Sequence, residues 1–489
     1  MKKIMFIAFL LTAYFSNGQN TLLNADFWKK NPDLETVKTE IASGNSPSEA
    51  NKGNFDVVSL AILNDAPFEI ISFLINQEGN SVKKITHDGR IYLHWAAYKG
   101  NPNLVKFLLD RGSDINRTDD KGSIPIVFAA SSGMANPKIY ELFFNAGNNP
   151  TQKFKNGTNL LLLSIANDSD LKLADYLVTK GLTYSDTDEF GNTVFNYAAR
   201  NGDVKLLQNL NKKDLKFDGR ALIIASQGSR GTSTNLEGYK YLIEELKINA
   251  NSVGDDGENV LHNLVKKQKQ EENIAYFLEK GVDVNHQDKQ KNTVLMNATR
   301  GNIEIIKTFI SKIKDVNTTN AKGYSALTFA VENGSSKMVA FLLSNGAKAN
   351  VIDAKGYNLA YFLIQSYKAD SNKFEDFTEK LNLLKNAGLD ITVPQKDGNT
   401  LYHLAVAKND LNLLKKLEGF DIDINSKNEE GMTALHKAAM LAKDDSILKY
   451  LISRKANKEI KTEFDETTYD LASENESLIE NKIAIDFLK

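Results

Sequence analysis

One stretch of this chain decides its fold: residues 88–118 read DGRIYLHWAAYKGNPNLVKFLLDRGSDINRT. Gly89 opens the stretch, and glycine readily adopts the positive φ of a tight turn. Leu93 and Ala96 follow four and seven residues later, a helical spacing that places both on one buried face. A second apolar run ends at Gly112, which is typical of a left-handed helix cap. The stretch therefore predicts a turn, a first helix and a second helix.

The same phrase recurs along the chain about every 34 residues, so that the fold is a repeat array. This matters because a single hydrophobic core stops growing at roughly 250 to 300 residues, whereas the chain has 489. Stacked repeats need no central core. The copies are anchored at Gly89, Gly122, Gly157, Gly191, Gly219, Gly257, Lys291, Gly323, Gly356, Gly398, Gly431 and Glu466.

Two positions of the phrase predict how each first helix begins and packs. Two residues after the anchor, eight copies carry a Ser, Thr or Asn, which are N-cap residues. These are Asn159, Thr193, Asn259, Thr293, Ser325, Asn358, Thr400 and Thr433. Seven residues after the anchor most side chains are small, so that neighbouring helices can approach closely. Among them are Ala96, Ala129, Ser164, Ala198, Ala298, Ala330, Ala405 and Ala438.

These copies resemble the ankyrin repeat family. Besides residues 88–118, the stretches KGYSALTFAVENGSSKMVAFLLSNGAKAN from Lys322 and EGMTALHKAA from Glu430 are similar to the ankyrin phrase. The resemblance implies an all-α solenoid of stacked helix-turn-helix repeats with short β-hairpin loops, in about 12 to 13 units including caps. It also implies that four histidines, five residues after their anchors, hydrogen-bond the backbone of a neighbouring loop. These are His94, His262, His403 and His436.

The predicted organisation has four segments: a signal peptide over residues 1–18, capping or degenerate repeats over 19–84, the ankyrin array over 85–463 and a capping repeat over 464–489. Terminal repeats must show one polar face to water. An alternative in which residues 20–86 form an independent binding domain stays open. Two insertions, at 228–238 and within 365–380, are expected as long loops and are candidates for added functions.

The N-terminus predicts export. Lys2 and Lys3 precede an apolar run from Ile4 to Phe15, which is shorter than the roughly 20 residues needed to cross a bilayer. Ser16 and Gly18 are small residues of the kind found at a signal peptidase site. We expect cleavage after Gly18 and a protein that is periplasmic or secreted from a bacterium. An uncleaved anchoring helix is the alternative.

Composition and motifs exclude several kinds of chemistry. The chain has no cysteine, which excludes disulfides, thiolate catalysis and cysteine metal sites. Its 60 basic and 62 acidic residues are interspersed, which does not favour nucleic-acid binding. The remaining histidines, His87 and His286, lack metal-ligand spacing, and no nucleophile elbow or phosphate-binding loop is present. We expect no catalytic residue, cofactor or metal, and a soluble monomer without membrane insertion.

The candidate site is a surface. In ankyrin arrays the residues beside the anchor lie at hairpin tips, and those nine and ten positions after it lie on the exposed side of the first helix. Together they line a concave face. Tyr and Arg are enriched at interface hot spots. The expected protein-binding residues are Arg90, Tyr98, Lys99, Arg200, Arg220, Lys322, Tyr324, Lys355 and Tyr357.

The predicted function is therefore an exported, non-enzymatic ankyrin protein that binds another protein through this face. A narrower alternative is an immunity or regulator protein for one cognate enzyme or toxin. An alternative of another class is an envelope hydrolase, with its site in one of the two insertions or in the N-terminal segment. The sequence shows no convergent acid and base residues that such an enzyme would need.

Overall fold

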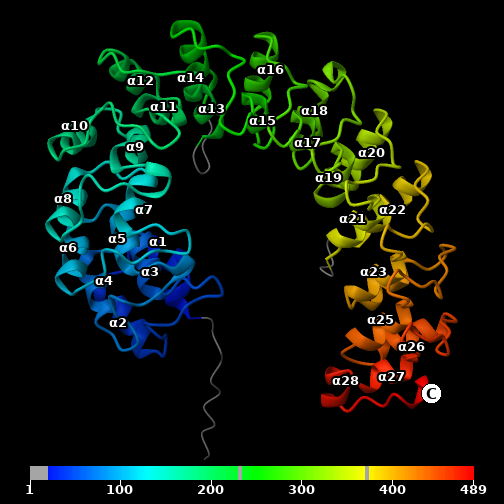
Figure 1. Ribbon diagram of the computed structural model, residues 1–489. Coiled ribbons are helices and arrows are strands. Elements are labelled where there is room, and N and C mark those ends of the chain that lie inside the picture. Colours follow the sequence, from blue (N-terminus) through cyan, green and yellow to red (C-terminus); the bar gives the residue numbers. More distant parts are fainter. Residues whose placement is uncertain (1–19, 229–233, 369–373) are drawn as a thin grey trace, which may run out of the picture. The chain divides into compact units, whose positions relative to one another are not determined.

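The computed structural model describes residues 20–228, 234–368 and 374–489, which form short α-helices joined by turns (Figure 1). Along the chain, each turn leads into a first helix, a loop and a second helix. The chain divides into two parts, and each is described by itself. The predicted signal peptide lies outside the described residues.

The first part comprises residues 20–221 with residue 234. Its helix pairs begin close to the N-terminus and continue without a break through the predicted boundary at residue 84. They are α1 (Ala25–Lys29) and α2 (Leu34–Ala42), α3 (Val57–Leu63) and α4 (Phe68–Ile75), α5 (Tyr92–Lys99) and α6 (Pro102–Asp110), α7 (Pro125–Ser131) and α8 (Pro137–Asn145), α9 (Leu160–Ser164) and α10 (Lys172–Thr179), α11 (Val194–Ala198) and α12 (Val204–Asn211).

The second part comprises residues 222–228 and the described residues from 235 to 489. Its helices are α13 (Arg220–Gln227, from residue 222) and α14 (Leu236–Lys240), α15 (Val260–Leu264) and α16 (Glu271–Glu279), α17 (Val294–Ala298) and α18 (Ile303–Lys307), α19 (Ala326–Asn333) and α20 (Ser336–Ser344), α21 (Leu359–Ser366) and α22 (Phe374–Asn386), α23 (Leu401–Ala407) and α24 (Leu411–Lys416), α25 (Ala434–Leu441) and α26 (Ser446–Ser453), α27 (Thr468–Ser473) and α28 (Glu476–Glu480). A π-helical turn, Tyr241–Glu245, continues α14.

The predicted all-α repeat fold is confirmed, with two differences of detail. The described residues form fourteen helix pairs rather than 12 to 13, because residues 20–84 hold two complete pairs. The expected β-hairpins are reduced to isolated antiparallel bridges, such as Thr319 with Ser325 and Ile352 with Asn358. No longer strand occurs within the described ranges.

The first helices begin where the capping residues predict. All eight predicted residues lie at the N-cap of a first helix. At α19, for example, the N–H of Thr328 donates to Ser325 Oγ at 3.3 Å. Such a bond satisfies one of the backbone donors that the first turn of a helix leaves unpaired. The start of each first helix is thus fixed locally.

We call the turns before the first helices the anchor turns, and six of them share one hydrogen-bonding device. A side-chain oxygen three residues before the anchor accepts from two backbone N–H groups of the same turn. Asp353 Oδ1, for example, accepts from the N–H of Lys355 at 2.9 Å and from that of Tyr357 at 2.8 Å. Equivalent residues are Asp119, Asp188, Asp288, Asn320 and Asn428. The device holds the backbone of these six turns in place without help from a strand.

Neighbouring anchor turns are held together by their backbones. The N–H of Ala354 donates to the carbonyl oxygen of Lys322 at 2.9 Å, across one repeat. Gly323 makes this approach possible, since its φ is +78° and a Cβ there would lie 2.7 Å from the backbone nitrogen of Ala354. Adjacent anchor turns therefore form a continuous surface wherever such bonds occur.

Helices stack on their equivalents in the next repeat. In the first part α5 packs on α7 and α7 on α9, while α6 packs on α8. In the second part α19, α21, α23, α25 and α27 pack in the same order (Figure 1). Ala96, Ala129, Ala330 and Ala438 are buried at the predicted positions in the first helices. Their small side chains let the helices approach, and each repeat buries its apolar face against its neighbours.

The N-terminal helices belong to the same stack. Helix α3 packs on α5 and α4 on α6. The buried Asp56 joins the two repeats, because Tyr92 donates to Asp56 Oδ2 at 2.5 Å and Lys84 Nζ lies 2.9 Å from the same oxygen. Residues 56–84 thus share a core with the repeat that follows.

The two predicted insertions are not simply loops. Residues 365 and 366 end α21, and residue 380 lies inside α22, the longest helix of the chain's described part. The expectation of a long loop there is wrong for residues 374–380, which are helical. In the other insertion, α14 begins at Leu236. Residues 229–233 and 369–373 lie outside the described residues.

Among the described helices, none combines the length and the apolar character needed to cross a membrane.

Candidate functional site

Four of the nine predicted surface residues lie together in the second part of the chain. Lys322 and Lys355 are exposed at the tips of adjacent anchor turns. Tyr324 and Tyr357, two residues further on in each turn, are half-buried. The turns themselves are joined by the bond between Ala354 and Lys322. These two repeats therefore present two lysines and two tyrosines on one continuous surface.

The tyrosines belong to a larger group of rings, which we call the aromatic cluster: Tyr324, Phe329, Tyr357, Tyr361 and Phe362. Tyr357 stacks on Tyr361 with 4.0 Å between ring centroids, and Tyr361 meets Phe362 edge-on. Tyr324 lies against Phe362 at 5.0 Å and against Phe329 at 5.9 Å. Burial raises the pKa of Tyr324, Tyr357 and Tyr361, so their hydroxyls remain neutral donors. Rings that already pack together lose little side-chain entropy when a partner covers them.

Tyr361 was missed by the sequence analysis, although a signal for it exists. It lies five residues after Gly356, the position that holds histidine in four other repeats. Those histidines are fully buried, whereas Tyr361 is half-buried and stacks on Tyr357. Tyr361, in place of a buried histidine, therefore gives this repeat additional exposed aromatic surface.

Arg90 does not lie on the surface, and the exposed position predicted for it is wrong. Its side chain is 4% exposed, and that of its partner Asp119 is 1% exposed. Nε and Nη2 of Arg90 contact Asp119 Oδ2 at 3.1 and 3.0 Å. The guanidinium also lies over Phe128 and Trp95, 4.2 and 4.9 Å from the ring centroids. Arg90 is held inside because the next anchor turn supplies its buried carboxylate.

Arg90 and Tyr98 line a cavity of about 710 Å³ in the first part. Phe55, Trp95 and Phe128 provide its apolar wall. Tyr98 is 38% exposed and lies 5.6 Å from the Phe128 ring. Because the charge of Arg90 is matched by Asp119 and Asp88, the cavity contains no unmatched charge that points to a particular ligand.

The other three predicted residues make contacts within the chain. Lys99 Nζ lies 2.6 Å from Asp65 Oδ2 and 3.1 Å from the carbonyl oxygen of Leu63. Arg220 forms an ion pair with Asp218 at 2.5 Å and donates to the carbonyl of Phe190. The Arg200 guanidinium lies 5.5 Å from the Tyr197 ring centroid, and burial lowers its pKa. These side chains cross-link repeats or pack within one.

The histidines bridge repeats, as the family resemblance implies. The Nε2 atoms of His94, His262, His403 and His436 lie 2.8–3.1 Å from carbonyl oxygens of the following anchor turn or loop. A carbonyl only accepts, so Nε2 carries the proton and Nδ1 is free to accept the N–H of its own N-cap residue. Burial lowers the pKa of all four, to about 4 for His94 and His262. No metal-binding group of three or more His, Asp or Glu residues occurs among the described residues.

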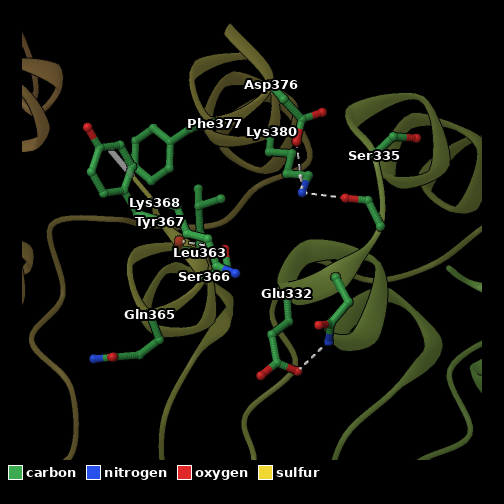
Figure 2. Close-up of a pocket in the computed structure, with 12 residues that line it drawn as sticks. Glu332, Ser335, Leu363, Gln365, Ser366, Tyr367, Lys368, Asp376, Phe377 and Lys380 are labelled. Atoms are coloured by element: carbon green, nitrogen blue, oxygen red, sulfur yellow. Dashed lines mark hydrogen bonds and ion pairs between the residues drawn. The ribbon is translucent and has the colours of Figure 1, made fainter. Parts of the chain in front are cut away.

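A second cavity, of about 560 Å³, lies beside the 365–380 insertion (Figure 2). Its buried Lys380 donates to the carbonyl oxygens of Gly334 and Val331 at 2.6 and 3.2 Å, and its Nζ lies 3.0 Å from Asp376 Oδ2. Tyr367 packs edge-on against Phe377. Lys380 therefore fastens α22 to the C-terminal end of α19, and its three acceptors leave it unsuited to act as a nucleophile.

Comparison with known families fits this architecture. A family model for ankyrin repeats in three copies matches residues 28–119, 261–353 and 362–463, which is more than half of the chain. The chain belongs to the ankyrin repeat family. A second model, for ankyrin repeats in many copies, matches residues 162–210. Ankyrin repeats mediate protein–protein interactions, and the family is generally a non-enzymatic scaffold.

Similar proteins share these repeats at low identity. Mouse Rabankyrin-5 is 26% identical over 187 residues, which cover 36% of this chain and 16% of that protein. Human transient receptor potential cation channel subfamily A member 1 is 23% identical over 389 residues, covering 72% and 32%. Chicken nuclear factor NF-kappa-B p105 subunit is 27% identical over 198 residues, covering 38% and 19%. The chain thus spans about a third or less of the length of these relatives.

Proposed function

We propose that this ankyrin protein is a non-catalytic monomer that binds another protein through the concave face predicted for the array, with the aromatic cluster at the centre of the contact. The observation that carries the proposal is the packing of Tyr324, Tyr357 and Tyr361 beside the exposed Lys322 and Lys355. Neither nucleic acid nor the membrane interior is part of the proposed interaction.

The physical basis is a preformed surface. Tyr side chains bury a large area and keep a polar group for hydrogen bonding, which is why they are enriched among hot spots. The backbone bond between adjacent anchor turns and the capping bonds within them fix the spacing of these side chains before a partner arrives. Binding then costs little ordering entropy, and each further repeat adds contacts.

Replacing Tyr324 and Tyr357 together by Ala is expected to weaken partner binding by at least about 30-fold, roughly the 2 kcal/mol associated with a hot spot. Stability should fall only modestly, because both side chains are half-buried. The measurement is capture of a cross-linked, stoichiometric partner from the producing cells, followed by titration of that partner against both proteins.

A matched control replaces Tyr241 and Tyr450, which are equally half-buried but lie on the second helices of their repeats. This variant should lose comparable stability and keep the partner. Equal capture by the wild type and the Tyr324 and Tyr357 variant would reject the aromatic cluster as the binding face.

We also propose export, on the basis of the lysines and apolar run in residues 1–18. The protein recovered from its cells is expected to begin at Gln19 and to appear outside the cytoplasm. Mass spectrometry of the intact protein after cell fractionation measures both. A cytoplasmic protein that retains residues 1–18 would contradict the proposal.

A further inference from the structure

We propose that the anchor turns from residue 289 to residue 396 bind an extended acidic segment of the partner protein. This inference rests on the proposed function and adds the chemistry of what is bound. It is carried by five side chains, which we call the lysine row: Lys289, Lys291, Lys322, Lys355 and Lys396. They lie on four successive anchor turns of one part of the chain.

The lysine row carries unmatched positive charge. All five side chains are exposed. Within the described residues, none of their ammonium groups lies within 4.0 Å of a carboxylate, in contrast to Lys99, Lys121 and Lys280 on other repeats. A lysine that makes no ion pair within its own protein can bind an anionic partner without first breaking an internal contact.

Hydrogen bonds between adjacent anchor turns hold these lysines in one row. The N–H of Ala321 donates to the carbonyl of Gln290, and the N–H of Ala354 donates to that of Lys322, both at 2.9 Å. The next turn is joined through Gln395, which accepts from the N–H of Asn358 at 3.0 Å and donates to its side chain at 3.1 Å. The aliphatic part of Lys396 lies directly over Gly356. Four turns therefore present their lysines side by side.

The carboxylates of this region do not cancel the row. Asp288 and Asp353 are turned into their own anchor turns, where each accepts two backbone N–H groups. Asp397 accepts a hydrogen bond from the hydroxyl of Tyr357 at 3.3 Å. Glu332, near the end of α19, is bonded by the side-chain amide of Asn333 at 2.9 Å. These carboxylates keep their charge, but the five lysines of the row outnumber the four acids named here, so these turns are net basic although the whole chain carries a formal charge of −2.

The row has limited length, which favours a protein ligand over a nucleic acid. The anchor turn before it carries Asp255, Asp256 and Glu258, and the turn after it carries Glu429 and Glu430. A uniformly charged phosphate backbone that extended along the turns would meet these acidic residues at both ends. A protein segment can place a short acidic block between neutral residues. The aromatic cluster beside the lysines supplies apolar area that such a segment can also cover.

The probe is a fluorescein-labelled peptide of about twelve residues with alternating Glu and Gly, titrated by fluorescence anisotropy. The full-length protein is expected to bind it, with affinity falling about tenfold or more when salt rises from about 0.05 M to about 0.5 M. The variant K322E/K355E/K396E should lose at least about tenfold in affinity. A peptide with Lys in place of Glu should not bind.

The control variant K314E/K337E/K348E has the same net charge and changes three exposed lysines that lie outside the anchor turns. It should bind the Glu peptide within about twofold of the wild type. Circular dichroism of both variants checks that they are folded. Absence of binding by the wild type, or an equal loss in both variants, would overturn the inference.

Two further comparisons distinguish a nucleic-acid ligand from an acidic protein segment, and failure of this inference from failure of the proposed function. A labelled single-stranded oligonucleotide that binds more tightly than the peptide and is lost in K322E/K355E/K396E would replace the acidic segment by a nucleic acid. In one outcome, a partner is captured through the aromatic cluster while neither the Glu peptide nor an acidic segment of that partner binds to the lysine row. In that case the proposed function stands and the further inference fails. If no partner is captured through that cluster, the proposed function itself fails.

Discussion

Lowering the pH from about 7.5 to about 5 is expected to destabilise the stack by about 2 kcal/mol for each of His94 and His262. Both side chains are fully buried, and burial lowers their pKa to about 4. In each, Nε2–H donates to a carbonyl of the next anchor turn while Nδ1 accepts a backbone N–H. A second proton on Nδ1 would face that N–H in a fully buried site.

The sign follows from the two pKa values of each imidazole. In the unfolded chain an imidazole titrates near 6.5, whereas in the folded chain it stays neutral down to about 4. The unfolded state therefore binds more protons between these values, and stability falls as the pH drops through that window. The nearby Asp119 and Asp288 oppose this shift but do not reverse it. His403 and His436 add in the same direction, because burial also lowers their pKa.

Urea denaturation followed by circular dichroism at a series of pH values measures the effect. The variant H94Q/H262Q should be less stable than the wild type at pH 7.5, yet lose about 4 kcal/mol less between pH 7.5 and pH 5. The single variants H94Q and H262Q should each account for about half of that difference. An unchanged pH dependence in H94Q/H262Q would show that these histidines do not link stability to pH.

The fold was predictable because its determinants are local and repeated. Each anchor turn and each helix start is set by residues a few positions apart, such as Ser325 with Thr328 or Asp353 with Tyr357. An array repeats this evidence in copy after copy, so one atypical anchor such as Lys291 does not obscure the pattern. Lys291 has a φ of +61°, which is positive like that of most anchor glycines. The number of pairs was underestimated because residues 20–84 carry two pairs without the full phrase.

The candidate surface was less predictable because exposure depends on residues one repeat away. Arg90 and Tyr324 both directly follow their anchor glycines, but Arg90 is buried whereas Tyr324 is half-buried. Arg90 is buried because the following turn places Asp119, 29 residues later, against its guanidinium. The position of a residue within its repeat predicts where its backbone lies, whereas contacts with the neighbouring repeat decide whether its side chain is buried or exposed. Tyr361 was missed for a different reason: it stacks on Tyr357 of its own repeat, at a position where four other repeats hold a buried histidine.

Replacing Arg90 by Ala should therefore destabilise the first part by about 3 to 5 kcal/mol, the usual effect of removing one member of a buried ion pair. The change would leave Asp119 Oδ2 buried without its cation and would remove the contacts with the rings of Trp95 and Phe128. Asp119 Oδ1 would still accept two backbone N–H groups, so the anchor turn should survive.

The free energy of unfolding of R90A is compared with that of R117A, a variant that removes an exposed arginine 27 residues later. The comparison distinguishes loss of the buried ion pair from a general effect of removing a positive charge. R117A should lie within about 0.5 kcal/mol of the wild type. Adding D119N to R90A should recover part of the lost stability, because the asparagine keeps an oxygen for the turn and removes the unpaired charge. Arg90 would be a surface residue after all if R90A lost less than about 1 kcal/mol. Recovery in the double variant would place its main role in the joint between two anchor turns.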